Sequence, residues 1–159
     1  MKTYVLTLSK TFPATHPRHG EPTEFLEKFL NGQTGTFGVQ KLHTIRANYQ
    51  LWEKRVKEVQ NGKAVLSVRQ WSGRPYASKQ VTVATLTAAD GVGIQPLEII
   101  DYRKGHLYSI WEKGKYPYNV DPGKLALNDG LTPKDWLAWF KDYDCSQPLA
   151  IIHFTSFRY

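Results

Sequence analysis

A short run of the chain, Lys41-Leu42-His43-Thr44-Ile45-Arg46, places several side chains that could act together in chemistry. Hydrolysis of an amide requires a nucleophile, a base to accept its proton and a donor for the developing oxyanion. Thr44 could supply the hydroxyl, and Lys41 could act as the base if burial or the nearby Arg46 lowers its pKa. The same residues would equally suit a binding site, with Lys41 and Arg46 contacting phosphate and His43 beside them. The residue types alone leave catalysis and binding both open.

The geometry of a β-strand restricts how these side chains can cooperate. Side chains alternate along a strand, so Lys41 and His43 are predicted to face one side while Thr44 and Arg46 face the other. Only a bend or a bulge at this point would bring Lys41 and Thr44 together. The alternative interpretation is a solvated basic strand at the edge of a sheet.

The charge and the aromatic content favour a polyanionic partner. The chain has 21 basic and 14 acidic residues, a formal net charge of +7, and 13% aromatic residues. Released counterions drive the binding of basic proteins to RNA, DNA or nucleotides, and interleaved rings can stack on bases. Packing in the core is the alternative role for these rings. Cations and rings alternate at Arg69, Trp71 and Arg74, and again at Trp111, Lys113, Lys115, Tyr116 and Tyr118.

Other chemistries have little support in the sequence. His16 and His19 lie in a proline-rich loop with no adjacent third ligand, so we predict no metal site, and we predict no cofactor. Cys145 is the only cysteine and cannot form an internal disulfide, which is typical of a reducing compartment. The chain contains no apolar run of the ~18 residues that a membrane-spanning helix needs. We therefore expect a cytoplasmic protein without a membrane partner.

Local signals predict three helices. Residues 25–30 have helical spacing and are expected to end at Asn31-Gly32. Residues 49–60 follow a plausible cap at Asn48 and have one apolar face. Residues 133–143 begin at Thr132-Pro133-Lys134-Asp135, where the threonine caps the helix and Asp135 can reach back to the cap.

The remaining segments predict strands. Residues 3–9 alternate, residues 63–71 and 79–86 form a hairpin, and residues 149–154 form an apolar last strand. Residues 94–102 and 106–112 form a second hairpin that turns at residues 103–105, with Pro96 indicating an edge position. One domain over residues 1–159 is expected, of α+β class, built on a mostly antiparallel, closed or nearly closed β-barrel with flanking helices.

The order of these pieces resembles the ASCH domains of the PUA-like superfamily. The resemblance rests on Lys41-x-x-Thr44-Ile45-Arg46 and on Asn128-Asp129-Gly130-Leu131-Thr132, and it covers about two thirds of the chain. Residues 88–122 look like an insertion relative to that pattern. The resemblance implies a PUA-like barrel whose cleft binds RNA or a modified nucleoside.

The resemblance also implies a set of catalytic residues. In one small bacterial ASCH protein, a lysine, a threonine and an acid together hydrolyse the amide of an acetylated cytidine nucleoside. The matching positions here are Lys41, Thr44 and Asp129, with aspartate in place of the family's glutamate and about one methylene shorter.

Two functions of different classes follow, and the sequence favours the first. One is a module that binds RNA or a modified nucleotide through Lys41–Arg46, including His43 and Arg46, and through Arg69, Trp71 and Arg74. The other is a small amidohydrolase that acts on N-acylated nucleosides through Lys41, Thr44 and Asp129. A protein-interaction domain is a third alternative, because five tryptophans and nine tyrosines could form a contact patch. The sequence says nothing about the oligomeric state.

Overall fold

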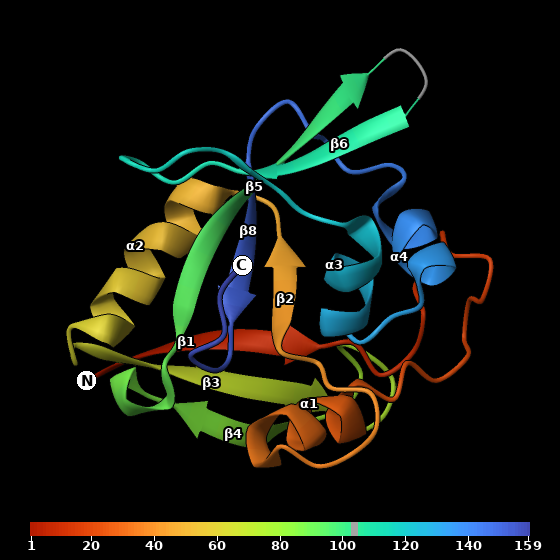
Figure 1. The fold of residues 1–159 in the computed structure, drawn as a ribbon. Coiled ribbons are helices and arrows are strands. Elements are labelled where there is room, and N and C mark those ends of the chain that lie inside the picture. Colours follow the sequence, from red (N-terminus) through yellow and green to blue (C-terminus); the bar gives the residue numbers. More distant parts are fainter. Residues whose placement is uncertain (103–104) are drawn as a thin grey trace.

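The computed structural model describes residues 1–102 and 105–159, which form a mixed α+β structure (Figure 1). Within these residues there are two sheets of mostly antiparallel strands, four α-helices and the short 3₁₀ helix η1 (Ala88–Asp90). The predicted α+β class is therefore confirmed. The predicted closure into a barrel is not seen, because no strand pairing among the described residues joins the two sheets.

The first sheet has three strands in the order β1-β3-β4. Its strands are β1 (Lys2–Leu8), β3 (Ala64–Trp71) and β4 (Gln80–Leu86). The predicted hairpin is confirmed, since β3 and β4 pair antiparallel with an irregularity between Val68 and Arg69. The β1–β3 pair is parallel, which places the start of the chain beside a strand that follows it by about sixty residues.

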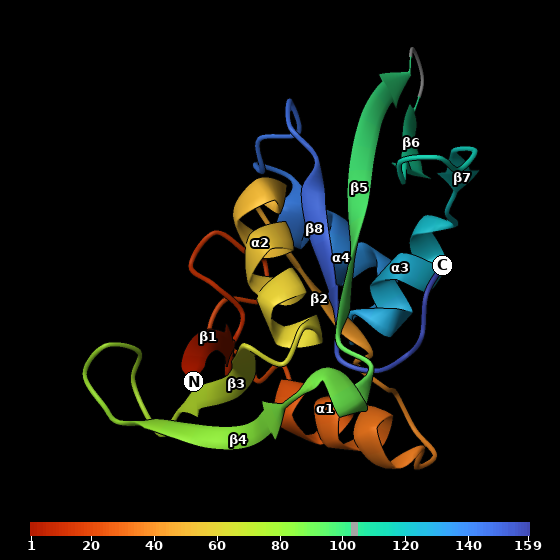
Figure 2. The same cartoon turned by 90° about the vertical axis from the view of Figure 1, so that its left-hand side faces the viewer.

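The second sheet has five strands in the order β2-β8-β5-β6-β7, and every neighbouring pair is antiparallel. Its strands are β2 (His43–Arg46), β8 (Leu149–His153), β5 (Gly93–Tyr102), β6 (Gly105–Ile110) and β7 (Tyr118–Asn119). The outer parts of β5 and β6 project from the rest of the fold (Figure 2). The expected second hairpin is present, although two residues of its predicted turn, 103 and 104, lie outside the described residues.

Residues 88–122 contribute directly to this second sheet. β5 pairs with β8 along Gly93–Leu97, so the segment that resembles an insertion supplies an internal strand. Pro96 was expected at an edge, but β5 lies between β8 and β6. The proline is tolerated because pairing with β6 begins only at Leu97, so β5 has a single neighbour at Pro96.

Helix α1 (Phe25–Thr34) runs past its predicted end and is capped by Gly35 in the left-handed conformation. Gly32 therefore lies inside the helix, and its role is close packing. A Cβ on Gly32 would lie 3.0 Å from the carbonyl oxygen of Lys41. The missing side chain thus allows α1 to pack directly against the segment that precedes β2.

The other two predicted helices are present, although the second ends at Phe140, before its predicted end at residue 143. Asn48 caps α2 (Tyr49–Gln60) by accepting a hydrogen bond from the backbone N–H of Leu51, and α2 packs on strands of both sheets. Thr132 caps α4 (Pro133–Phe140) by accepting one from the N–H of Asp135. The expected return contact from the Asp135 carboxylate is absent, because that carboxylate instead accepts a hydrogen bond from Arg18 at 2.6 Å. A further helix, α3 (Pro122–Asn128), precedes α4 and contacts it.

Candidate functional site

Lys41 and Thr44 line the same cavity because Lys41 is not part of a strand. β2 begins only at His43, and the backbone N–H groups of the two residues before it donate to helices rather than to a strand. The N–H of Lys41 donates to the carbonyl of Lys28 in α1, and the N–H of Leu42 donates to that of Asn128 in α3. The alternation expected to separate Lys41 from Thr44 is therefore wrong at this point, because the backbone turns into the strand after Leu42.

The solvated edge strand proposed as the alternative is also wrong in one respect. β2 is indeed at the edge of its sheet, but its side chains are shielded from water. Only 2% of Lys41, 6% of Thr44 and 3% of Asp129 is exposed, and His43 is fully buried. Buried lysines are rare unless they are paired, so this cluster needs a specific partner for the ammonium.

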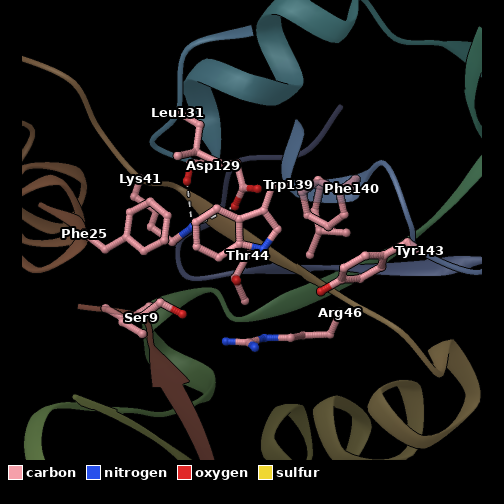
Figure 3. A pocket seen from close by; sticks show the side chains of 12 residues that line it. Ser9, Phe25, Lys41, Thr44, Arg46, Asp129, Leu131, Trp139, Phe140 and Tyr143 are labelled. Atoms are coloured by element: carbon pink, nitrogen blue, oxygen red, sulfur yellow. Dashed lines mark hydrogen bonds and ion pairs between the residues drawn. The ribbon is translucent and has the colours of Figure 1, made fainter. Parts of the chain in front are cut away.

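Asp129 is that partner, although it lies 88 positions away in the sequence. It follows the last residue of α3, where its backbone N–H still bonds to the carbonyl of Leu125. The Lys41 Nζ lies 2.7 Å from the Asp129 Oδ1 and 2.6 Å from the Asp129 carbonyl oxygen. Dashed lines mark the contacts between the two residues in Figure 3. It also lies 4.1 Å from the centre of the Phe25 ring, an arrangement typical of a cation–π contact.

Burial shifts both members of this pair toward their neutral forms. Desolvation lowers the pKa of Lys41 below its ordinary value, and the Asp129 charge opposes that shift, while Arg46 and Lys28 add to it. Desolvation likewise raises the pKa of Asp129, with Lys41 opposing. Each shift favours the neutral form of its own group, and the lowered pKa makes Lys41 more readily deprotonated than a lysine in water.

His43 faces away from the cavity and connects Asp129 to a residue that the sequence did not single out. Its Nε2 lies 2.6 Å from the hydroxyl of Tyr159, which also accepts a hydrogen bond from the side chain of Asn128 at 3.0 Å. Its Nδ1 has no hydrogen-bond partner and lies 3.8 Å from the Asp129 Oδ1. Desolvation, His153 and Lys41 hold the pKa of His43 well below its ordinary value. His43 is thus a buried neutral support for the site and not a surface cation.

The cavity above the pair is small, and polar, aliphatic and aromatic side chains line it. Its volume is about 30 Å³, and Thr44 and Arg46 of β2 line it together with Lys41 and Asp129. Figure 3 shows rings around this space, including Phe25 of α1. The remaining lining side chains include Ser9, Leu131, Trp139, Phe140 and Tyr143. A space of this size holds a few atoms of a ligand, not a whole nucleoside.

Arg46 joins this cavity to a larger groove. Its Nη2 donates a hydrogen bond of 2.5 Å to the carbonyl of Thr7, while its Nε is buried without a partner. The groove has a volume of about 760 Å³ and is also lined by Trp71 and Tyr76. Ser9 and Arg46 line both spaces. Of the other residues predicted to bind, Arg69 donates a hydrogen bond to Ser67, and neither it nor the exposed Arg74 lines the groove.

The second cation–aromatic cluster lies elsewhere, in the segment that follows β6 and on β7. Trp111, Tyr116 and Tyr118 are each at least half exposed, and Lys115 forms an ion pair with Glu112. None of these side chains lines the cavity or the groove.

The two loop histidines, His16 and His19, and Cys145 lie in surroundings typical of structural residues. His16 is buried, with its Nε2 3.0 Å from the carbonyl of Asp135 and its Nδ1 accepting from the N–H of Arg18. His19 lines the groove. In the described part of the chain, no three histidine, cysteine, aspartate or glutamate side chains gather as metal ligands would. Burial raises the pKa of Cys145, whose thiol lies against the carbonyl of Tyr143.

Comparison with known proteins gives no match at the level of families, curated proteins or solved structures. None of the helices described is long and apolar enough to cross a membrane. The functional argument therefore depends on the site itself.

Proposed function

We propose that this protein is a small amidohydrolase that cleaves the acyl group from an N-acylated nucleoside or nucleotide. One observation carries the proposal: a fully buried lysine is paired to a buried aspartate beside a threonine hydroxyl, and all three line one cavity. Perturbed, desolvated ionisable groups in a cavity are typical of catalytic sites. The resemblance to ASCH domains, whose catalytic lysine, threonine and acid fall at the same three positions, supports the same reaction.

The burial of Lys41 argues against a purely electrostatic role. A lysine that binds phosphate keeps its charge available at the surface, whereas the charge of Lys41 is balanced by Asp129 at 2.7 Å. Removing both groups from water also costs free energy. A lysine whose pKa is lowered by burial is instead suited to accept and return a proton.

The first half of the reaction uses Thr44 and Lys41. The Thr44 Oγ attacks the acyl carbon while its proton passes to the neutral Lys41 amine, and the carbonyl becomes an oxyanion. The Arg46 Nε, a buried donor without a partner, is placed at the same cavity and can donate to that oxyanion. The C–N bond then breaks, and Lys41 returns the proton to the departing exocyclic amine, leaving an acyl ester on Thr44.

The second half consumes one water molecule. Lys41, neutral again, accepts a proton from water, which attacks the ester and releases the carboxylic acid, while Thr44 recovers its proton. Asp129 positions the amine throughout by accepting its hydrogen bond, which leaves one position on the Lys41 nitrogen for the cavity. The net reaction is amide plus water giving carboxylic acid plus amine.

Turnover of a panel of N-acylated nucleosides tests this proposal. Released nucleoside would be measured by chromatography for the wild type, for T44V, which removes the hydroxyl at nearly constant shape, and for T82V, whose threonine is exposed on β4. We expect T82V to match the wild type and T44V to lose at least a hundredfold in kcat. Absence of turnover across the panel, or a T44V variant as active as T82V, would refute the hydrolase.

A nucleotide-binding module is the second candidate, and the groove beside Arg46 favours it. With its volume of about 760 Å³ and its mixed aromatic and basic lining, the groove is of the size that small-molecule sites usually have. Nucleotide binding without turnover, weakened by R46A, would support this function in place of catalysis.

A further inference from the structure

The space between the β3–β4 hairpin and the loop that follows β1, here called the hairpin groove, is built from two segments far apart in the sequence. The hairpin contributes Trp71, Tyr76 and Gln80, and the loop contributes Lys10, Phe12 and His19. Its volume of about 760 Å³ contrasts with about 30 Å³ for the cavity at Lys41. Because the two spaces share Ser9 and Arg46, a ligand that reaches Lys41 with one end can place its larger part in the groove.

Hydrogen bonds join the two walls of the groove. The Lys10 Nζ donates to the carbonyl of Ser72 at 3.1 Å, and the Gln80 side chain donates to the Thr7 hydroxyl at 3.1 Å. The ring centres of Trp71 and Tyr76 lie 5.2 Å apart at the end of the hairpin. The groove is therefore a formed feature of the fold, with aromatic surface held at its mouth.

The chemistry of the lining indicates the ligand. Lys10, His19 and Arg46 are its basic side chains, and no Asp or Glu is among the residues described as lining it. The Arg46 Nε is buried without a partner at the junction with the cavity, so an acceptor on the ligand would satisfy it. Tyr76 is 92% exposed and has a φ of 62°, a conformation that side chains other than glycine rarely adopt. Such strain is found where a side chain is presented for binding.

We infer that the hairpin groove is a subsite for a nucleobase that carries a phosphate, stacked on Trp71 and Tyr76, with only the acyl group entering the cavity at Lys41. Aromatic side chains bind bases by stacking, and nearby cations bind the backbone phosphate. The inference rests on the proposed function for the acyl end of the ligand. It names the substrate class more narrowly, as a phosphorylated nucleoside instead of a free one. The phosphate can belong to a mononucleotide or to an RNA strand.

Binding of unacylated ligands tests the subsite independently of catalysis. Titration calorimetry would compare cytidine, cytidine 5′-monophosphate and a trinucleotide RNA on the wild type, W71A, Y76G and W111A. Glycine at position 76 tolerates the positive φ, so Y76G removes the ring without adding strain. Trp111 is a half-exposed tryptophan outside the groove and serves as the matched control.

We expect cytidine 5′-monophosphate to bind more tightly than cytidine, and W71A and Y76G each to weaken it about 5- to 100-fold. W111A should bind as the wild type does. K10A should reduce the dependence of binding on salt by about one unit of slope if Lys10 contacts one phosphate, whereas K54A, on α2, should not. If the trinucleotide binds no better than the mononucleotide, the bound phosphate belongs to a mononucleotide. If it binds clearly better, the phosphate belongs to an RNA strand.

The outcomes separate this inference from the proposed function. If nucleotides bind in a way that depends on Trp71 and Tyr76, but no acylated ligand is turned over, the subsite is supported and the hydrolase is refuted. If acylated ligands are turned over, but W71A and Y76G have the same Kd and KM as W111A, the subsite is refuted and the hydrolase is supported. Equal affinity for cytidine and its monophosphate refutes the phosphate part of the inference.

Discussion

Lowering the pH from 7 to 5 should destabilise the folded protein through two buried histidines, His43 and His153. Both side chains are fully shielded from water. Burial, with a smaller contribution from Arg158, lowers the pKa of His153 from 6.5 to about 3. Burial, His153 and Lys41 hold the pKa of His43 well below the same starting value.

The direction of this pH effect on stability follows from how many protons the folded and the unfolded states bind. A histidine whose pKa is lower in the folded state stays neutral there while the unfolded chain takes up a proton below pH 6.5. Its contribution to stability is therefore complete above pH 6.5 and is lost as the pH falls toward the folded value, about 3 for His153. Each pH unit within this window costs about 1.4 kcal/mol per histidine. From pH 7 to 5 the loss is about 2 kcal/mol for His153, and His43 adds a loss in the same direction. The loss at His153 alone is a substantial part of the roughly 5–15 kcal/mol typical of a domain.

Other groups act in the same or the opposite direction, so a variant must isolate the histidines. The raised pKa of Asp129 has the opposite sign, because its folded form binds a proton more readily than its unfolded form. The lowered pKa of Glu58 acts below its ordinary value of 4.5, beneath the range considered. H153Q removes one titrating group and keeps an amide that can donate to Gln95, the present partner of His153 at 2.9 Å. H106Q changes an exposed histidine and is the matched control.

Urea unfolding at pH 7, 6 and 5, followed by tryptophan fluorescence, measures the effect. We expect the free energy of unfolding of the wild type and of H106Q to fall in parallel. H153Q should start lower at pH 7 but lose about 2 kcal/mol less between pH 7 and 5. A pH dependence of H153Q that parallels the wild type would refute the reasoning, as would an NMR titration showing His153 protonated near pH 6.

The other predictions concern the site and one helix. K41A, T44V and the double variant should lose similar activity, because residues that act as one unit are not additive in turnover assays. The pH–rate profile should rise through an apparent pKa below the ~10.4 of an unperturbed lysine, and a rise at that value would contradict a buried base. D129E lengthens the side chain by about one methylene, and a crowded carboxylate should lower thermal stability by about 1–3 kcal/mol; unchanged stability would show that the site has room for a glutamate. Y159F removes the hydroxyl bonded to His43 and should cost about 1–3 kcal/mol in urea unfolding, while an unchanged midpoint would show that this contact is dispensable. T132A should cost about 1 kcal/mol through loss of the α4 cap, and a circular-dichroism melt identical to the wild type would contradict capping.

Local sequence determined the elements whose stabilising contacts are close along the chain. The caps at Asn48 and Thr132 bond to backbone groups three residues away, so residue type and spacing identify them. The hairpin of β3 and β4 follows from alternation and a turn between adjacent segments. The end of α1 was misplaced because Gly32 looks like a local stop signal, whereas its role is to let the helix pack against Lys41.

The site depended on contacts between distant segments. Residue types and the resemblance to ASCH domains pointed to Lys41, Thr44 and Asp129, but the strand pattern placed Lys41 on the wrong side. Only the tertiary structure shows the backbone of Lys41 and Leu42 bonded to α1 and α3, which turns the lysine toward an aspartate 88 positions away. Desolvation of that pair, and the support of His43 by Tyr159, likewise arise from packing. Burial and long-range contact are properties of the whole fold, because the atoms that exclude water come from every part of the chain, and no local pattern of residues records them.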